Sequence, residues 1–232
     1  MSNMLHLCIK LKNLDLKLFK TLNGENMSYM LFCCSSLKTL ELNIFDTKNV
    51  TTIHNIFYDC SSLEQLDLSS FNTENVIDMS NMFSHCRTLE KLDLSSFNTK
   101  NVRDMLNMFG GCEFLNEVNL KSFTTEDVSM CNMFKDCKSL EKLDLSSFYC
   151  ESISNVKDMF EDCSNLKEIK CNNEIIINNI MGNINIIIHL FYFLIICLEA
   201  IYLTMVALFL DMEFDSIKFY YILKLINLNN FK

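Results

Sequence analysis

The sequence predicts an α/β repeat protein, a solenoid with a parallel sheet on its concave face and short helices on its convex face. A segment of about 26 residues recurs along the chain, as DLSSFNTENVIDMSNMFSHC at 67–86 and DLSSFNTKNVRDMLNMFGGC at 93–112. Within each copy the apolar spacing changes from the alternation typical of a strand to a helical period. One such segment cannot bury its apolar residues alone, so the repeats are expected to stack.

Cysteine marks the register of the repeats. It recurs in steps of 26 or 25 residues, at Cys8, Cys34, Cys60, Cys86, Cys112, Cys137 and Cys163. We divide the chain into a repeat domain at 1–171, a connector rich in Asn and Ile at 172–185, a hydrophobic segment at 186–210 and a tail at 211–232. The repeat domain comprises a half-repeat at 1–10, six repeats at 11–165 and a partial repeat at 166–171. Because MSNMLHLC at 1–8 matches MSNMFSHC at 79–86, we expect a fragment or a misassigned start codon.

The elements of one repeat follow in order. LxxLxL at 63–68 predicts a short strand, and SSF at 69–71 predicts a turn. About two helical turns are predicted next, from apolar residues at Val76, Met79, Met82, Phe83 and Cys86. Asn75 and Asp78 are spaced like a capping box at the start of this helix, as are Asn101 and Asp104 in the next repeat.

Composition excludes some classes of protein. The formal net charge of −9 argues against nucleic-acid binding, which needs clustered Lys and Arg. The chain has no proline and four glycines, so a flexible Pro-rich or Gly-rich linker is not expected. The first twenty residues lack the uninterrupted apolar segment of a signal peptide.

The repeats resemble the BspA-like leucine-rich repeats of the 26-residue variety, which follow the pattern LxxLDLSSFxTxxVxDMSxMFxxCxxL. The resemblance covers residues 1–171 and implies a leucine-rich-repeat solenoid. It also implies a surface protein that adheres to or binds other proteins, since the family occurs in surface proteins of bacteria and some protists. The segment after residue 171 matches no part of the family pattern.

The cysteines that keep the register occupy an apolar position, and we interpret them as small buried side chains. Neither a C-x-x-C motif nor a Cys/His quartet is present, so no metal site is predicted. The off-register Cys33, Cys131, Cys150 and Cys171 are free to be exposed.

One polar position between the strand leucines forms the candidate ligand-binding strip. Its acidic members are Asp15, Glu41, Asp67, Asp93 and Asp144. In an LxL strand this position points away from the core, onto the concave face. Three interpretations stay open: a solvated face, a strip that binds a basic or polar protein segment, and a file of metal ligands, although no single repeat supplies the ligands that calcium needs.

Catalysis is not expected. The Ser-Ser pairs fall in predicted turns, and a nucleophilic Ser needs a His and a carboxylate held against it. The four histidines share no position in the repeat. We therefore predict no enzyme activity and no cofactor.

The segment 186–210 differs from the repeats, because only His189, Glu199 and Thr204 interrupt its apolar residues. Its length and hydrophobicity predict a transmembrane helix. A buried helix that covers one end of the repeats and translated noncoding sequence are the alternatives. The function predicted from all these features is a non-catalytic protein–protein interaction module, anchored in the membrane at the cell surface. An intracellular scaffold tethered to a membrane, or a truncated gene product that binds nothing, are the alternatives.

Overall fold

The structure, a computed structural model, describes residues 1–16, 24–43 and 45–183. The chain divides into two compact units, Met1–Asn185 and Ile186–Lys232. The predicted transmembrane helix at 186–210 and the tail after it lie outside the described residues. Within the described ranges, no helix is long and apolar enough to cross a bilayer. The structure therefore gives no support to a hydrophobic C-terminal helix or to a membrane span.

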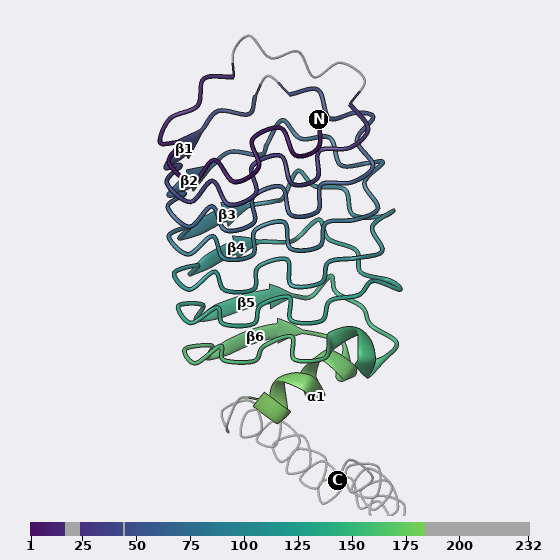
Figure 1. The fold of residues 1–232 in the computed structure, drawn as a ribbon. Helices are drawn as coiled ribbons and strands as arrows, with labels where there is room; N and C mark the ends of the chain where they lie inside the picture. The colour runs from purple at the N-terminus through teal and green to yellow at the C-terminus, as the bar shows by residue number, and fades with distance from the viewer. Residues whose placement is uncertain (17–23, 44, 184–232) are drawn as a thin grey trace, which may run out of the picture. The chain divides into compact units, whose positions relative to one another are not determined.

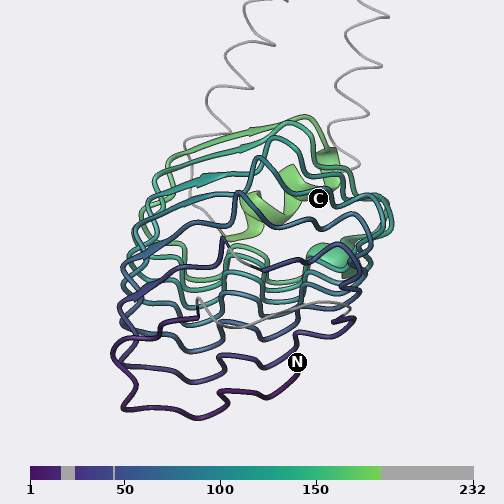
Figure 2. The same ribbon diagram turned by 90° about the horizontal axis from the view of Figure 1, so that it is seen from above.

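In the first unit, successive repeats lie one above another and run parallel (Figures 1 and 2). The strands are β1 (Thr39–Leu40), β2 (Gln65–Leu66), β3 (Lys91–Asp93), β4 (Glu117–Asn119), β5 (Lys142–Leu145) and β6 (Glu168–Cys171). They pair in parallel as β1 with β2, β3 with β4 and β5 with β6. Each pairing joins equivalent positions of neighbouring repeats, as in Leu92 opposite Val118.

The predicted α/β solenoid is wrong in its elements. The expected continuous sheet is replaced by three two-stranded sheets. The expected short helix in every repeat is also missing from the described residues, which contain only a 3₁₀ helix, η1 (Ile153–Val156), and one α-helix, α1 (Glu174–Asn183). Of the leucines in these strands, Leu92 and Leu143 are buried, whereas Leu66 is half-buried.

Consecutive tight turns replace the predicted helices. We call these segments the turn rows; they are residues 1–8, 27–34, 53–60, 79–86, 105–112, 130–137 and 156–163. Within a row, amide groups close turns over three residues, as from Met82 to the carbonyl of Met79. Other amides of the same row donate to carbonyls of the following repeat, as the amide of Asn81 does to the carbonyl of Leu106 at 2.8 Å. Each row is thus bonded to its neighbour rather than coiled on itself.

Left-handed residues explain why a helical spacing of apolar residues does not give a helix. Two residues per row have positive φ, such as Asn81 at 53° and Asp136 at 60°. A right-handed helix cannot continue through such a residue, and Asn, Asp and Gly tolerate this conformation best. The positions are Asn3, Leu7, Tyr29, Cys33, Asn55, Asp59, Asn81, His85, Asn107, Gly111, Asn132, Asp136, Asp158 and Asp162.

The predicted capping pairs serve the turn rows instead. The side-chain amide of Asn75 donates to the carbonyl of Lys48 in the preceding repeat. The carboxylate of Asp78 accepts the amide of Ser80, at 2.9 Å. Both side chains satisfy backbone groups, but neither begins a helix.

The core contains columns in which one residue type recurs at the same position of successive repeats. Phe57, Phe83, Phe109, Phe134 and Phe160 stack with ring centroids 5.2–5.8 Å apart. A second column consists of buried Thr47, Thr73, Thr99 and Thr125. Each threonine hydroxyl both donates to and accepts from the backbone of the next repeat, for example at Asn98 for Thr73. Shared columns therefore hold each repeat to the next.

Candidate functional site

The strand face carries the predicted acidic strip. Asp67 and Asp93 are exposed, and Asp144 is half-buried, at equivalent positions of successive repeats. Asp93 lies opposite Asn119, and Asp144 lies opposite Lys170 in the paired strands. Asp15 and Glu41 are exposed as well, in the first two repeats. The structure thus places all five predicted residues at corresponding positions.

These aspartates also have a structural task that the sequence reasoning missed. The carboxylates of Asp67, Asp93 and Asp144 each accept the backbone amide two residues later, at 2.9–3.0 Å. Hydrogen bonds from Ser69 and Ser95 lower the pKa of Asp67 and Asp93. The hydroxyl and amide of Ser146, assisted by Lys170, lower the pKa of Asp144 to about 2. The DLSS pattern could have indicated this turn, because Asp commonly accepts the amide two residues on.

The two halves of this face differ in charge pairing. In the second half, which we define as residues 94–171, acids of the strand face have basic partners. Glu117 pairs with Lys91 and Glu168 with Lys142, each at 2.8 Å, and Asp144 pairs with Lys170 at 3.2 Å. In the first half, residues 1–93, Glu64 pairs with Lys38 at 2.8 Å, but no ion pair from the described residues reaches Glu41, Asp67 or Asp93.

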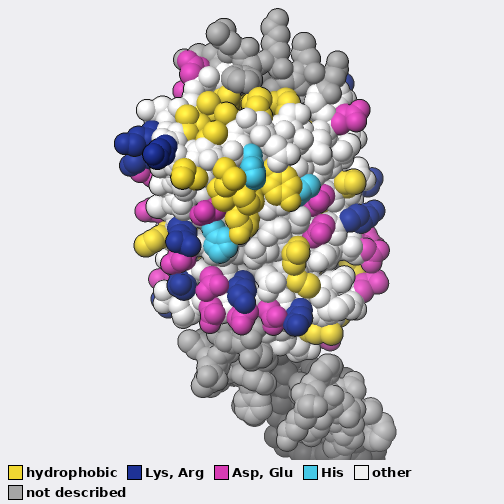
Figure 3. All heavy atoms as spheres, in the orientation of Figure 1, with side chains coloured by type: hydrophobic (Ala, Val, Ile, Leu, Met, Phe, Trp, Pro, Cys, Tyr) yellow, Lys and Arg dark blue, Asp and Glu magenta, His cyan; other side chains and the backbone are white. Residues whose placement is uncertain are grey.

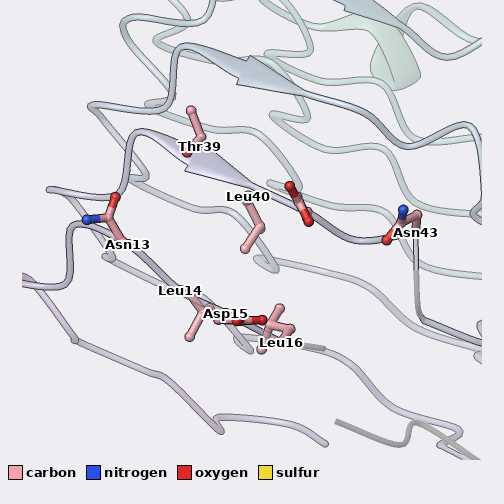
Figure 4. A pocket seen from close by; sticks show the side chains of 8 residues that line it. Asn13, Leu14, Asp15, Leu16, Thr39, Leu40 and Asn43 are labelled. Atoms are coloured by element: carbon pink, nitrogen blue, oxygen red, sulfur yellow. The ribbon is translucent and has the colours of Figure 1, made fainter. Parts of the chain in front are cut away.

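Two hollows lie on the first half of the strand face. The smaller, about 230 Å³, is lined by residues 13–16 and 39–41 with Asn43 (Figure 4). The larger, about 580 Å³, is lined by residues 39–41, 64–67, Glu90 and Lys91. They share Thr39, Leu40 and Glu41, so they adjoin along this segment, and together we call them the acidic depression. Its carboxylates are Asp15, Glu41, Glu64, Asp67 and Glu90.

The cysteines that keep the register are structural. Cys34 to Cys163 of this column are buried, which confirms the interpretation from sequence. Each thiol donates to a carbonyl of the preceding repeat, for example Cys86 to Phe57 at 3.1 Å and Cys112 to Phe83 at 3.0 Å. Burial raises the pKa of Cys86 and Cys112 well above the ordinary value. Of the off-register cysteines, Cys150 is buried as well.

A Ser–His–Asp cluster, which the sequence reasoning did not identify, lies between the turn rows. His54 Nδ1 lies 3.0 Å from Ser28 Oγ, 2.8 Å from Thr52 Oγ1 and 3.3 Å from Asp78 Oδ2. A catalytic triad needs the serine and the carboxylate on opposite ring nitrogens of the histidine. Here both contact Nδ1, so the geometry fits a hydrogen-bonded structural cluster.

No group of three or more His, Cys, Asp or Glu that could hold a metal ion occurs among the residues that the structure describes. The strip carboxylates occur one to a repeat, and those of Asp67, Asp93 and Asp144 accept a backbone amide of the turn that follows. The arrangement suits contact with a larger charged partner better than coordination of one ion.

The comparison with protein families bears on the repeats. A family model described as "Mycoplasma protein of unknown function, DUF285" matches residues 1–119 and 85–175. The chain belongs to the DUF285 family. The two matches together cover both halves of the DUF285 repeats and the start of α1. No curated protein matches this DUF285 chain.

Proposed function

We propose that this DUF285 chain is a non-catalytic protein-binding module whose repeats are related to the BspA-like leucine-rich repeats. The observation that supports this most is the acidic depression on the first half of the strand face. Glu41 and Asp67, which line it, and Asp93 of the same face have no basic partner among the described residues. Acids left unpaired beside a concave surface attract a basic partner and accelerate its association.

A basic protein segment is the ligand class that this surface fits. Lys and Arg side chains would replace the missing partners of Glu41, Asp67 and Asp93, as Lys91 and Lys170 do for acids of the second half. Since Asp67 and Asp93 already accept a backbone amide, they are held in place before a ligand arrives.

The test compares two triple variants of the full chain for binding to fluorescein-labelled poly-L-lysine. The first is Glu41→Gln/Asp67→Asn/Asp93→Asn, which removes the unpaired acids and keeps a side-chain acceptor for the turn amides that Asp67 and Asp93 bind. The matched control is Glu117→Gln/Asp144→Asn/Glu168→Gln, which removes three paired acids. We expect the first variant to weaken binding about tenfold or more and to flatten its salt dependence. Equal weakening by both variants would mean that only net charge matters and would contradict the proposal.

A surface location goes with the BspA-like relationship and is part of the same proposal; the alternative is an intracellular scaffold. Selective protease treatment of intact cells separates them. Loss of the repeats under treatment that spares an internal marker supports the surface location, and survival of the repeats supports the scaffold.

A further inference from the structure

Six rings form a cluster on the outer side of the first turn rows, and we call it the aromatic patch. Its members are His6, Tyr29, Phe32, His54, Tyr58 and His85. Phe32 stacks between His6 and Tyr58, with centroids at 4.9 and 4.7 Å. The rings of Tyr29 and His54 meet edge to face at 4.9 Å. Four successive rows thus contribute to one surface.

The patch is accessible to solvent. His6 is exposed, and the other five rings are half-buried, in contrast to the Phe57–Phe160 column of the core. Figure 3 shows hydrophobic and histidine side chains gathered together on one face. Contiguous exposed apolar surface of this kind marks interaction sites on soluble proteins.

The fold does not require these rings. Tyr29 and His85 occupy left-handed positions, with φ of 57° and 61°, where other rows have mainly Asn, Asp or Gly. A bulky side chain is disfavoured in this conformation. A Cβ on Gly111 would lie 2.4 Å from His85 Nδ1, so the neighbouring row has room for that ring only because it has glycine there. Residues that break a local rule without a gain in packing are candidates for function.

The same positions change character further along the stack. The column of His6, Phe32 and Tyr58 continues with Ser84, Gly110, Lys135 and Glu161. Lys135 and Glu161 form an ion pair. The aromatic patch is therefore confined to the first rows, although the backbone of the later rows is equivalent.

The charges around the patch indicate the kind of partner. The rows 27–34, 53–60 and 79–86 contain no Lys or Arg. Asp59 follows Tyr58 directly, and Asp78 lies 3.3 Å from His54. We propose that the aromatic patch binds an arginine-containing segment of a partner protein. A guanidinium group packs on aromatic rings and also pairs with carboxylates, whereas the more strongly hydrated lysine ammonium does this less well.

A second copy of the chain fits this surface less well than a basic partner. The rows of the patch contain carboxylates but no Lys or Arg, and the whole chain has a net charge of −9 with histidine neutral, so two copies repel each other. The inference goes beyond the proposed function, because it concerns a different surface and a different chemistry of recognition.

The experiment uses the full chain with the strand-face acids neutralised, as Glu41→Gln/Asp67→Asn/Asp93→Asn, so that only the patch is tested. The probe is a labelled decapeptide that alternates Arg and Leu, compared with its Lys counterpart. The patch variant Tyr29→Asn/Phe32→Ser/Tyr58→Ser introduces the residues that equivalent rows already contain at Asn81 and Ser84. We expect it to weaken Arg-peptide binding about tenfold or more and to abolish the preference for Arg over Lys.

Stability provides the second readout. Tyr29→Asn alone should leave the melting temperature equal or higher, because Asn suits the left-handed position, and should still weaken binding. Lys135→Ser, in the same column outside the patch, should change neither binding nor preference. Unchanged peptide binding in the patch variant would overturn the inference. Self-association of the parent chain through the patch would also overturn it, because a second copy would then explain the rings. Unfolding of the Tyr29→Asn variant would overturn it as well, because the ring would then have a structural role. Because the strand-face acids are already removed, these outcomes are independent of the proposed function.

Discussion

The two halves of the repeat stack share an interior and differ on their surfaces. Phe83 in the first half and Phe134 in the second are equally buried, and each stacks on the next phenylalanine of its column. On the strand face, Asp67 and Asp93 have no basic partner among the described residues, whereas Asp144 has Lys170. On the turn rows, the first half has aromatic rings where the second half has an ion pair.

This difference separates what the fold needs from what it allows. A column works only if equivalent residues recur, so the core repeats across both halves. The surface positions have no such constraint, and they change from half to half. We therefore propose that binding belongs to the first half, and substitutions in the core and on the surface test this separation.

The largest effect is expected in the phenylalanine column. Phe83→Ala and Phe134→Ala should each lower the free energy of unfolding by about 3–5 kcal/mol, because each leaves a cavity in a shared core. Urea unfolding followed by circular dichroism measures this. The two losses should be similar. A loss at Phe134 of under half that at Phe83 would show that the halves differ inside as well as outside.

A smaller effect is expected in the threonine column. Thr73→Val keeps the shape but removes the hydroxyl that bonds both backbone groups of Asn98. The unsatisfied groups should lower the free energy of unfolding by about 1–3 kcal/mol. Thr73→Ser is the matched control and should cost less, since it keeps the hydroxyl. If the Val and Ser variants had the same free energy of unfolding, the threonine hydrogen bonds would not hold the repeats together.

The buried thiols predict a loss of stability in alkali. Burial raises the pKa of Cys60, Cys86 and Cys137 in the folded chain well above the ordinary 9.0. The contribution of these thiols to the free energy of unfolding is complete below pH 9. It is lost as pH rises, because the thiols of the unfolded chain then ionise while those of the folded chain stay protonated. Each thiol should account for about 1.4 kcal/mol per pH unit above 9. Cys86→Ala should reduce the slope of unfolding free energy against pH by about one sixth to one quarter; an unchanged slope would argue against burial of this thiol.

The smallest effect is expected at the strip. Asp67→Ala removes the acceptor for the Ser69 amide and should lower the free energy of unfolding by about 0.5–1 kcal/mol. Asp67→Asn keeps an acceptor and should change stability little, as Asn119 occupies the equivalent position. Thermal unfolding of the two variants measures the difference. Equal stability would mean that the side chain of Asp67 serves only the surface.

Periodicity in the sequence predicted the register, the buried cysteines and the equivalent placement of Asp15 to Asp144. It could not identify the turn rows, because a turn every four residues and a helix give similar apolar spacing at Met79, Met82 and Phe83. The signal that separates them is Asn or Asp at the left-handed positions, as at Asn81 and Asp136. The aromatic patch depends on side chains from four rows, so it emerges only when the rows are stacked.

The central claim is that a basic partner binds the first half of the stack. Photo-crosslinking tests it most directly: the Arg-Leu decapeptide carries a benzophenone group, is irradiated with the unmodified full chain, and the crosslinked residues are mapped by mass spectrometry. We predict that the crosslinks concentrate between residues 6 and 93, on the acidic depression and the aromatic patch, and that excess unlabelled peptide removes them. Crosslinks spread evenly over both halves, or concentrated between residues 117 and 171, would contradict the claim.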